Sequence, residues 1–244
     1  MLVNNYSIVN LVNNKEERAF MLNSNDWWQV ISNYNQKIFP MQWLIMLVGV
    51  ILSFYLIYGV ESKANIALKA YLSFCNFWIG SVFFIVLGTG FPSPLRQIQG
   101  SLFIVIAILL AVDIVTKKTW LKFPKEGIQR SVMVALLMVV FLYPVVGIVL
   151  GRSLDFCIYP GTLPCATTAF TLLLFTFSLP RVNKLTYSLL LIWAIPFPPL
   201  VQIPKYHVYE DGIMFLMGLY ALYALIASII KSRPSIKKTF HKQV

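Results

Sequence analysis

Side chains of metal-ligating and acid-base types gather in two short segments of an otherwise apolar chain. They are Asp155, Cys157, Tyr159 and Cys165 in the first segment, and His207, Glu210 and Asp211 in the second. Carboxylate, thiolate and imidazole groups are the ligands that proteins offer to transition metals. The spacing of these residues matches no standard metal site, so we predict no bound metal. We expect the two segments to converge and to line a vestibule.

Two of the three cysteines lie in this region. Cys157 and Cys165 are eight residues apart, and a disulfide between them would close the short turn that they flank. Such a bridge requires an oxidising compartment. Two free thiols, with Cys165 buried at the start of a helix, are the equal alternative, and the sequence leaves both open.

Enzyme signatures are absent from the sequence. No Ser-His-Asp arrangement, phosphate-binding glycine loop or dinucleotide fingerprint is present, and His207 and His241 are the only histidines. We therefore predict no catalytic residues and no cofactor. Asp113 is the only carboxylate within an expected membrane span, and such a residue is a functional candidate by default. It lies about one helical turn from Lys117 and Lys118, so we favour a structural role for it.

The elements that position these residues follow from hydropathy. The chain has 244 residues, of which 58% are hydrophobic and 12% charged, and its mean hydropathy is +0.73. Its apolar stretches approach the length needed to cross a hydrocarbon core of roughly 30 Å. The fold class is therefore all-α, a polytopic transmembrane helical bundle of about seven spans. The spans are expected at 41–60, 71–90, 98–116, 131–150, 165–180, 185–203 and 212–231.

The fifth and sixth spans carry the weakest signal. The fifth is short, and the sixth contains Pro196, Pro198 and Pro199, each of which removes a backbone hydrogen-bond donor. A six-span bundle with a re-entrant segment is the alternative. Tyr143-Pro144 should similarly interrupt the fourth span.

The chain divides into three parts by composition. Residues 1–40 form an N-terminal tail and an interfacial amphipathic helix, residues 41–231 the transmembrane domain, and residues 232–244 a basic cytoplasmic tail. The first part lacks the pattern of a signal peptide, so we expect it to be retained. Asp26 should cap the helix, whose apolar side chains recur at helical spacing until Pro40 ends it. Those side chains are Trp27, Trp28, Ile31, Tyr34 and Ile38.

The net charge is +11, and the Lys and Arg residues that produce it lie between the apolar stretches and in the C-terminal tail. They form no basic stripe of the kind that binds nucleic acid. The connections at 61–70, 117–130 and 181–184, together with the C-terminal tail, carry about 14 Lys and Arg, and the opposite face about 6. The positive-inside rule therefore predicts a cytoplasmic C-terminus and an outside N-terminus. We expect the lipid bilayer as a partner and no nucleic acid.

Three segments resemble a bacterial family of multi-pass membrane proteins of unknown function, DUF6064. In order, they are YNQKIFPMQ with Tyr34, Asn35, Pro40 and Gln42; YPVVGIVLG with Tyr143, Pro144, Gly147 and Gly151; and TLPCATTAFTLLL with Thr162, Pro164, Cys165, Thr168, Phe170 and Thr171. Their order and spacing cover most of residues 25–231. The chain departs from the family pattern after Trp193, where Ile195 to Pro199 replaces small residues.

The resemblance implies a multi-pass protein of a bacterial inner membrane and carries no assigned activity. Our leading hypothesis is a non-enzymatic protein that binds or passes a small solute or lipid through the vestibule. An intramembrane redox or metal-dependent enzyme using Cys157, Cys165 and His207 is the second hypothesis. A structural subunit of a membrane complex is the third, and small-molecule and protein partners stay undetermined.

Overall fold

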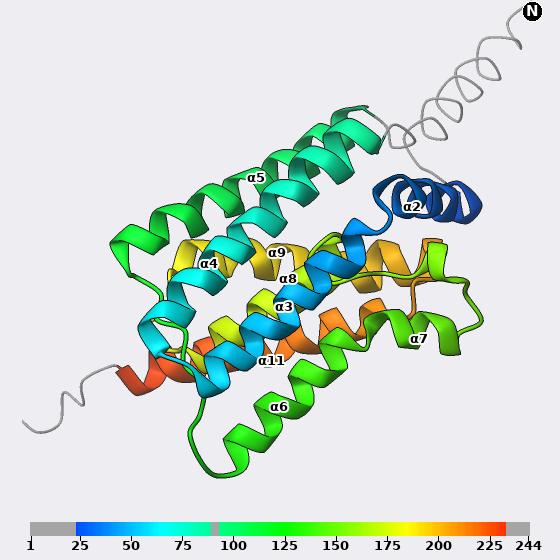
Figure 1. Ribbon diagram of the computed structural model, residues 1–244. Helices are drawn as coiled ribbons and strands as arrows, with labels where there is room; N and C mark the ends of the chain where they lie inside the picture. The colour runs from blue at the N-terminus through cyan, green and yellow to red at the C-terminus, as the bar shows by residue number, and fades with distance from the viewer. Residues whose placement is uncertain (1–22, 89–92, 233–244) are drawn as a thin grey trace, which may run out of the picture.

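The computed structural model describes residues 23–88 and 93–232, and every regular element in these ranges is helical (Figure 1). The tail expected before residue 23 and the basic tail expected after residue 232 lie outside these ranges. The elements are α2 (Ser24–Ile38), α3 (Met41–Tyr58), α4 (Glu61–Trp78) with η1 (Ile79–Leu87), α5 (Ser93–Thr116), α6 (Ile128–Phe141), α7 (Tyr143–Val149), η2 (Leu154–Phe156), α8 (Pro164–Phe177), α9 (Lys184–Ala194), η3 (Pro198–Gln202), α10 (Ile203–Tyr206) and α11 (Asp211–Ser232).

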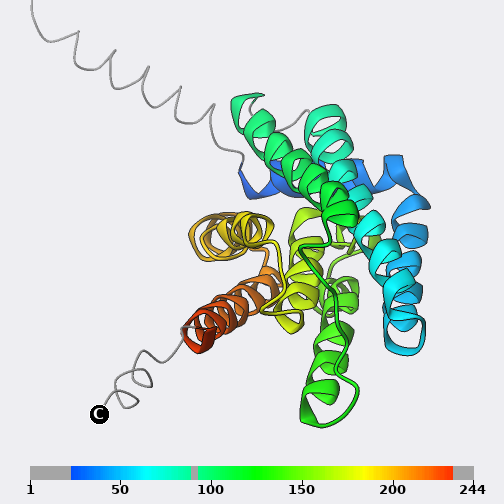
Figure 2. The ribbon, with the colours of Figure 1, turned by 90° about the vertical axis from the view of Figure 1, so that its left-hand side faces the viewer.

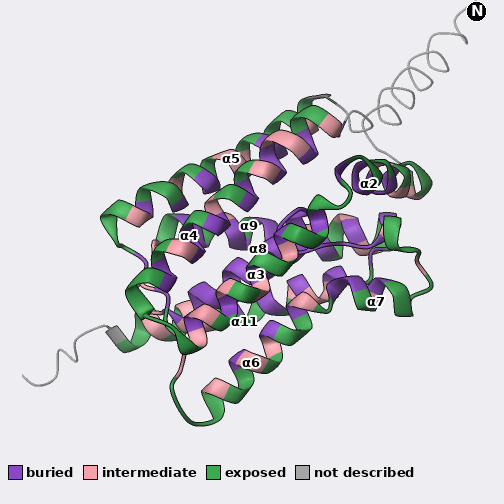
Figure 3. Ribbon diagram, viewed as in Figure 1, coloured by how far each residue is buried: buried purple, intermediate pink, exposed green. Residues whose placement is uncertain are grey.

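Within the described residues, five helical segments are long and apolar enough to cross a membrane, and a sixth is added if the bent pair α6 and α7 counts as one span. Only 22% of the apolar window of α11 and 28% of that of α3 is buried by other residues. The exposed large hydrophobic residues of these helices are largely Leu, Ile, Val, Phe and Tyr. Figure 3 shows exposed segments along the outward faces of the bundle. A surface of this kind needs lipid to cover it, so the chain is a multi-pass membrane protein.

The fifth expected span, at 165–180, is the short helix α8. Its 14 residues make a rod about 21 Å long, less than the roughly 30 Å of a hydrocarbon core. All of its residues except the last are buried, because α4, α6, α9 and α11 pack against it. Figure 2 shows α8 in the interior of the bundle. The expectation of seven independent spans is therefore corrected to five or six spans around a buried core helix.

Prolines shape two other spans. α6 and α7 meet at an angle of 57° beside Tyr143-Pro144, as expected from a residue that cannot continue the hydrogen-bond ladder. Pro198 begins the π-helical turn η3, yet Lys184–Tyr206 still qualifies as one candidate span. The proline cluster thus distorts the sixth expected span without dividing it.

The segment 61–70, expected as a loop, is helical instead. α4 begins at Glu61, and its residues Ala64 and Leu68 are fully buried. Lys69, counted above as a loop charge, is also buried, with only 2% of its surface exposed. Its ammonium group lies against the end of α5, a contact that compensates for the charge.

The helices run between two ends of the bundle. We call the end that carries α2, η2 and α10 the α2 end, and the end that carries the connection 117–127 the Asp113 end (Figure 1). α2 packs against η2, α10 and the start of α3. Its N-cap is Asn23, whose side chain accepts a 2.8 Å hydrogen bond from the Asp26 backbone, so the cap expected at Asp26 is corrected by three residues.

Candidate functional site

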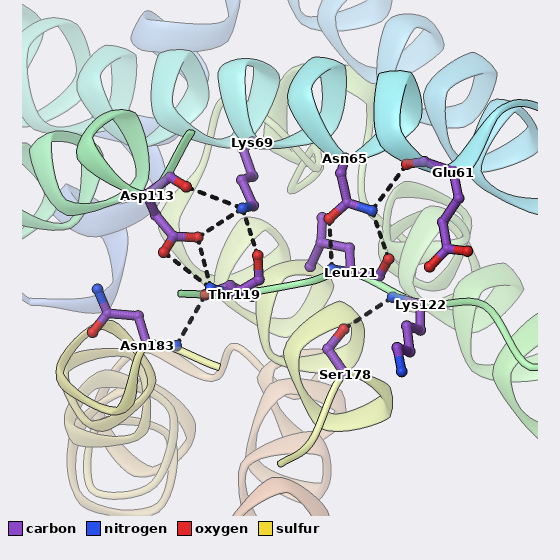
Figure 4. Close-up of polar contacts among 9 residues, drawn as sticks. All are labelled: Glu61, Asn65, Lys69, Asp113, Thr119, Leu121, Lys122, Ser178 and Asn183. Carbon is purple, nitrogen blue, oxygen red and sulfur yellow. Dashed lines mark hydrogen bonds and ion pairs between the residues drawn. The ribbon is translucent and has the colours of Figure 1, made fainter. Parts of the chain in front are cut away.

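The buried carboxylate Asp113 belongs to a hydrogen-bonded clamp at the Asp113 end (Figure 4). Lys69 Nζ lies 2.9 Å from Asp113 Oδ2 and donates to the carbonyls of Asp113 and Thr119 at 3.1 Å and 2.5 Å. The Thr119 backbone amide donates to both oxygens of Asp113 at 3.0 Å and 3.1 Å. The partner of Asp113 is therefore Lys69 on α4, not Lys117 or Lys118.

The same clamp fixes the connection between α5 and α6. Asn65 accepts from the Leu121 amide at 2.6 Å and donates to the Leu121 carbonyl at 2.7 Å. Thr119 Oγ1 accepts from the Asn183 amide at 2.9 Å. Each buried polar atom of this group has a hydrogen-bond partner. A structural role is therefore sufficient to account for the clamp.

A second group of buried polar residues lies at the α2 end, and some of its polar atoms lack a hydrogen-bond partner among the described residues. We call it the Asp211 cluster: Tyr143 on α7, Cys165 on α8, Gln202 on η3 and Asp211 at the start of α11. Tyr143 Oη donates to Asp211 Oδ1 at 3.3 Å, and Gln202 Nε2 donates to Cys165 Sγ at 3.0 Å. The Cys165 thiol lies beside the Asp211 carboxyl group.

The Asp211 cluster is closed to solvent but incompletely bonded. The exposed fractions of Asp211 and Gln202 are 0% and 2%. Asp211 Oδ2 and Gln202 Oε1 nevertheless have no hydrogen-bond partner among the described residues. Unpartnered buried oxygens are rare in folded proteins and call for an explanation.

Arg152 borders this cluster and connects it to α2. Its guanidinium group pairs with Glu210, donates to the His207 carbonyl at 2.8 Å and lies 3.8 Å from the centre of the Trp28 ring. Partial burial lowers the pKa of Arg152. Trp28 Nε1 donates in turn to the Tyr206 carbonyl at 2.9 Å. These contacts fasten α2 onto the loop that precedes α11.

A cavity of about 240 Å³ lies on the other side of Gln202. Its wall is formed by η1, α5, α9, η3, α10 and α2, and it is mainly aromatic and aliphatic. Trp193 stacks on Phe197 at 4.2 Å between ring centres, and Trp27 stacks on Tyr206 at 4.7 Å. The polar lining residues are Gln99, Gln202 and Lys205. Lys205 is exposed, so the cavity reaches the molecular surface beside it.

Of the seven vestibule candidates, Cys165 and Asp211 meet in the Asp211 cluster, and Glu210 pairs with Arg152 beside it. His207 meets Ser24, whose Oγ lies 3.3 Å from His207 Nδ1. The other three candidates lie in the loop after α7. Asp155 accepts from Gln36 at 2.9 Å, and Tyr159 donates to the Leu154 carbonyl at 2.9 Å.

Cys157 and Cys165 are both free, buried thiols. Cys157 donates to the Pro144 carbonyl at 3.4 Å, whereas Cys165 accepts from Gln202. Burial raises the pKa of Cys157, an effect that neighbouring Arg152 only partly offsets, so little reactive thiolate forms. Within the described residues, no three His, Cys, Asp or Glu side chains come together in a way that could hold a metal.

Sequence reasoning missed Arg152 and Gln202. Gln202 is a polar residue at the end of an apolar, proline-rich stretch, which is the signal that could have identified it. Arg152 was counted only as a loop charge. Its pairing depends on Glu210, which is distant in sequence, so no local pattern indicates it.

The motif residues named above hold the α2 end together. Tyr34 Oη donates to the Thr162 carbonyl at 2.9 Å and accepts from Trp78 Nε1 at 2.8 Å. Asn35 Nδ2 donates to the Asp155 and Cys157 carbonyls at 2.7 Å and 2.9 Å. Burial also raises the pKa of Tyr34, so its hydroxyl stays protonated and keeps donating. Gly147 packs against Cys157, and a methyl group in its place would lie 3.3 Å from the sulfur.

The helices and their lipid-facing surfaces define a multi-pass membrane protein whose buried polar cluster and cavity lie together at the α2 end. Residues 24–235 match the model of a family of unknown function, DUF6064, and the chain belongs to that family. No curated protein and no solved structure matches the chain.

Proposed function

We propose that this protein binds a single-chain anionic amphiphile, such as a fatty acid, in the cavity at the α2 end. The observation that carries the proposal is the cavity of about 240 Å³, which is apolar over most of its wall and has three polar lining residues. Small-molecule sites typically enclose roughly 300–1,000 Å³ and combine an apolar lining with a few polar groups. The cavity lies just below that range, so it is better suited to one acyl chain than to two.

The polar lining residues support a head group of negative charge. Lys205 is the one lining residue with a formal charge, and Gln99 and Gln202 are the other polar residues of the lining. Aromatic side chains such as Trp193 and Phe197 offer an apolar surface to the chain. On the charge count, the α2 end faces outside, and an amphiphile would enter from the outer leaflet beside α2.

The second hypothesis, redox or metal-dependent chemistry, receives less support from the same geometry. Cys157, Cys165 and His207 each have separate partners: the Pro144 carbonyl, Gln202 and Ser24. A shared catalytic role would need these groups to converge on one substrate atom.

Binding can be tested with a polyene fatty acid whose fluorescence rises in apolar surroundings, added to the protein in mild detergent. Val201→Trp places a large ring in the cavity and should weaken binding at least about tenfold, because the chain loses its space. Leu200→Trp is the matched control: it changes the adjacent residue, which is 68% exposed, and should leave affinity unchanged. Equal affinity of the two variants and the unmodified protein would overturn the proposal.

A further inference from the structure

Asp211 is a buried carboxyl group at the first residue of α11, and no cation is bonded to it among the described residues. Its Oδ1 accepts one hydrogen bond, from Tyr143, and its Oδ2 accepts none among the described residues. The Cys165 thiol is its neighbour on α8. Asp113 offers the contrast, because an ammonium group and a backbone amide both bond to its oxygens.

The charged groups around Asp211 do not supply it with a bonded counter-charge. Arg152 lies close enough to interact with it electrostatically. The guanidinium group, however, is bonded to Glu210, to the His207 carbonyl and to the Trp28 ring. Glu210, the preceding residue, adds negative charge, and the other titratable neighbours, Tyr143 and Cys165, are neutral in their ordinary forms. A carboxylate that is buried without a bonded cation takes up a proton.

We propose that Asp211 is a proton-binding site, at which a proton taken from water at the α2 end rests on Oδ2 of the buried carboxyl group. The protonated form has a donor to offer, and the unpartnered Oε1 of Gln202 lies in the same cluster as an acceptor. Binding and release involve only the O–H bond of the acid, with water as the source and destination of the proton.

Gln202 also links this proton to the cavity, a part of the inference that rests on the proposed function. The side chain of Gln202 lines the cavity and donates to Cys165 beside Asp211. An anionic head group near Gln202 would repel an ionised Asp211 and favour the protonated form. By linkage, protonation should then raise the affinity for the amphiphile by the same factor.

Infrared difference spectroscopy over a pH titration tests the proton site without any ligand. The protein should show the C=O stretching band of a protonated carboxylic acid, which shifts when aspartate is labelled with carbon-13 and disappears in Asp211→Asn. Asp155→Asn, which changes an exposed aspartate at the same end of the bundle, is the control and should keep the band. The isotope label identifies an aspartate even if Asp211→Asn fails to fold. Absence of the band at every pH, or its survival in folded Asp211→Asn, would overturn the proposal.

The link to the cavity is tested by titrating the polyene fatty acid at several pH values. Affinity should fall by up to about tenfold per pH unit across the range in which the infrared band disappears, the limit for one coupled proton. The Asp211→Asn variant should bind the polyene fatty acid with an affinity that does not change in this way across the same pH range. A titrating band with pH-independent affinity would overturn the link alone. Absence of probe binding at any pH would instead overturn the proposed function, while the band still reports on the proton site.

Discussion

Two buried aspartates, one at each end of the bundle, have opposite surroundings. Asp113 has an ammonium partner at 2.9 Å and two hydrogen bonds from one backbone amide. Asp211 accepts a 3.3 Å hydrogen bond from Tyr143 and lies beside the Cys165 thiol, and one of its oxygens has no partner among the described residues. Both residues are almost completely buried, so burial alone does not distinguish them.

The comparison sets a fully bonded cluster, which we interpret as structural, against an incompletely bonded one, to which our proposals assign a function. A fully bonded cluster recovers the cost of burying its charges and fixes the segments that it joins. An incompletely bonded cluster bears a cost that packing alone does not explain. The cavity lies beside the incompletely bonded cluster, and Gln202 belongs to both.

Removing the cation of the Asp113 end should have the largest effect. Lys69→Met leaves Asp113 buried without its ammonium partner and frees the Thr119 carbonyl. Loss of one partner of a buried ion pair costs about 3–5 kcal/mol, so the free energy of unfolding should fall by this amount. It can be measured by reversible unfolding in mixed detergent micelles. Lys63→Met, an exposed position on the same helix, is the control and should change stability little.

Arg152→Gln should have a smaller and more local effect. It removes the partner of Glu210 and the cation over Trp28, but the Arg152 side chain is 15% exposed, so water compensates in part. We expect a loss of about 1–3 kcal/mol, expressed mainly as faster amide hydrogen exchange in α2. Unchanged exchange in α2 would show that Arg152 does not fasten this helix.

Hydropathy alone predicted much of the bundle. The helices α3, α5 and α11 are strongly apolar, and each corresponds to an expected span. The break at Tyr143-Pro144 also followed from the sequence, since proline lacks the amide that a helix needs. These features depend on residues close together in the chain.

What sequence reasoning missed depends on distant contacts. The segment 61–70 is polar enough to suggest a loop, but it is helical, and Lys69 and Asn65 are buried in it against partners 44 and 56 positions away. α8 has the composition of a short span, and only the packing of four other helices identifies it as a core element. Cys165 and Asp211 were candidates from their chemical types, whereas the role of Gln202 required the three-dimensional arrangement.

The most direct test of the contrast between the two ends is to replace each aspartate by asparagine and to compare the free energies of unfolding at neutral pH. Asp113→Asn leaves the Lys69 ammonium group buried without its counter-charge, and it should cost about 3–5 kcal/mol. Asp211→Asn exchanges a protonated acid for an amide of nearly the same shape, and it should cost less than about 1 kcal/mol. Equal losses, or a larger loss for Asp211→Asn, would contradict the account.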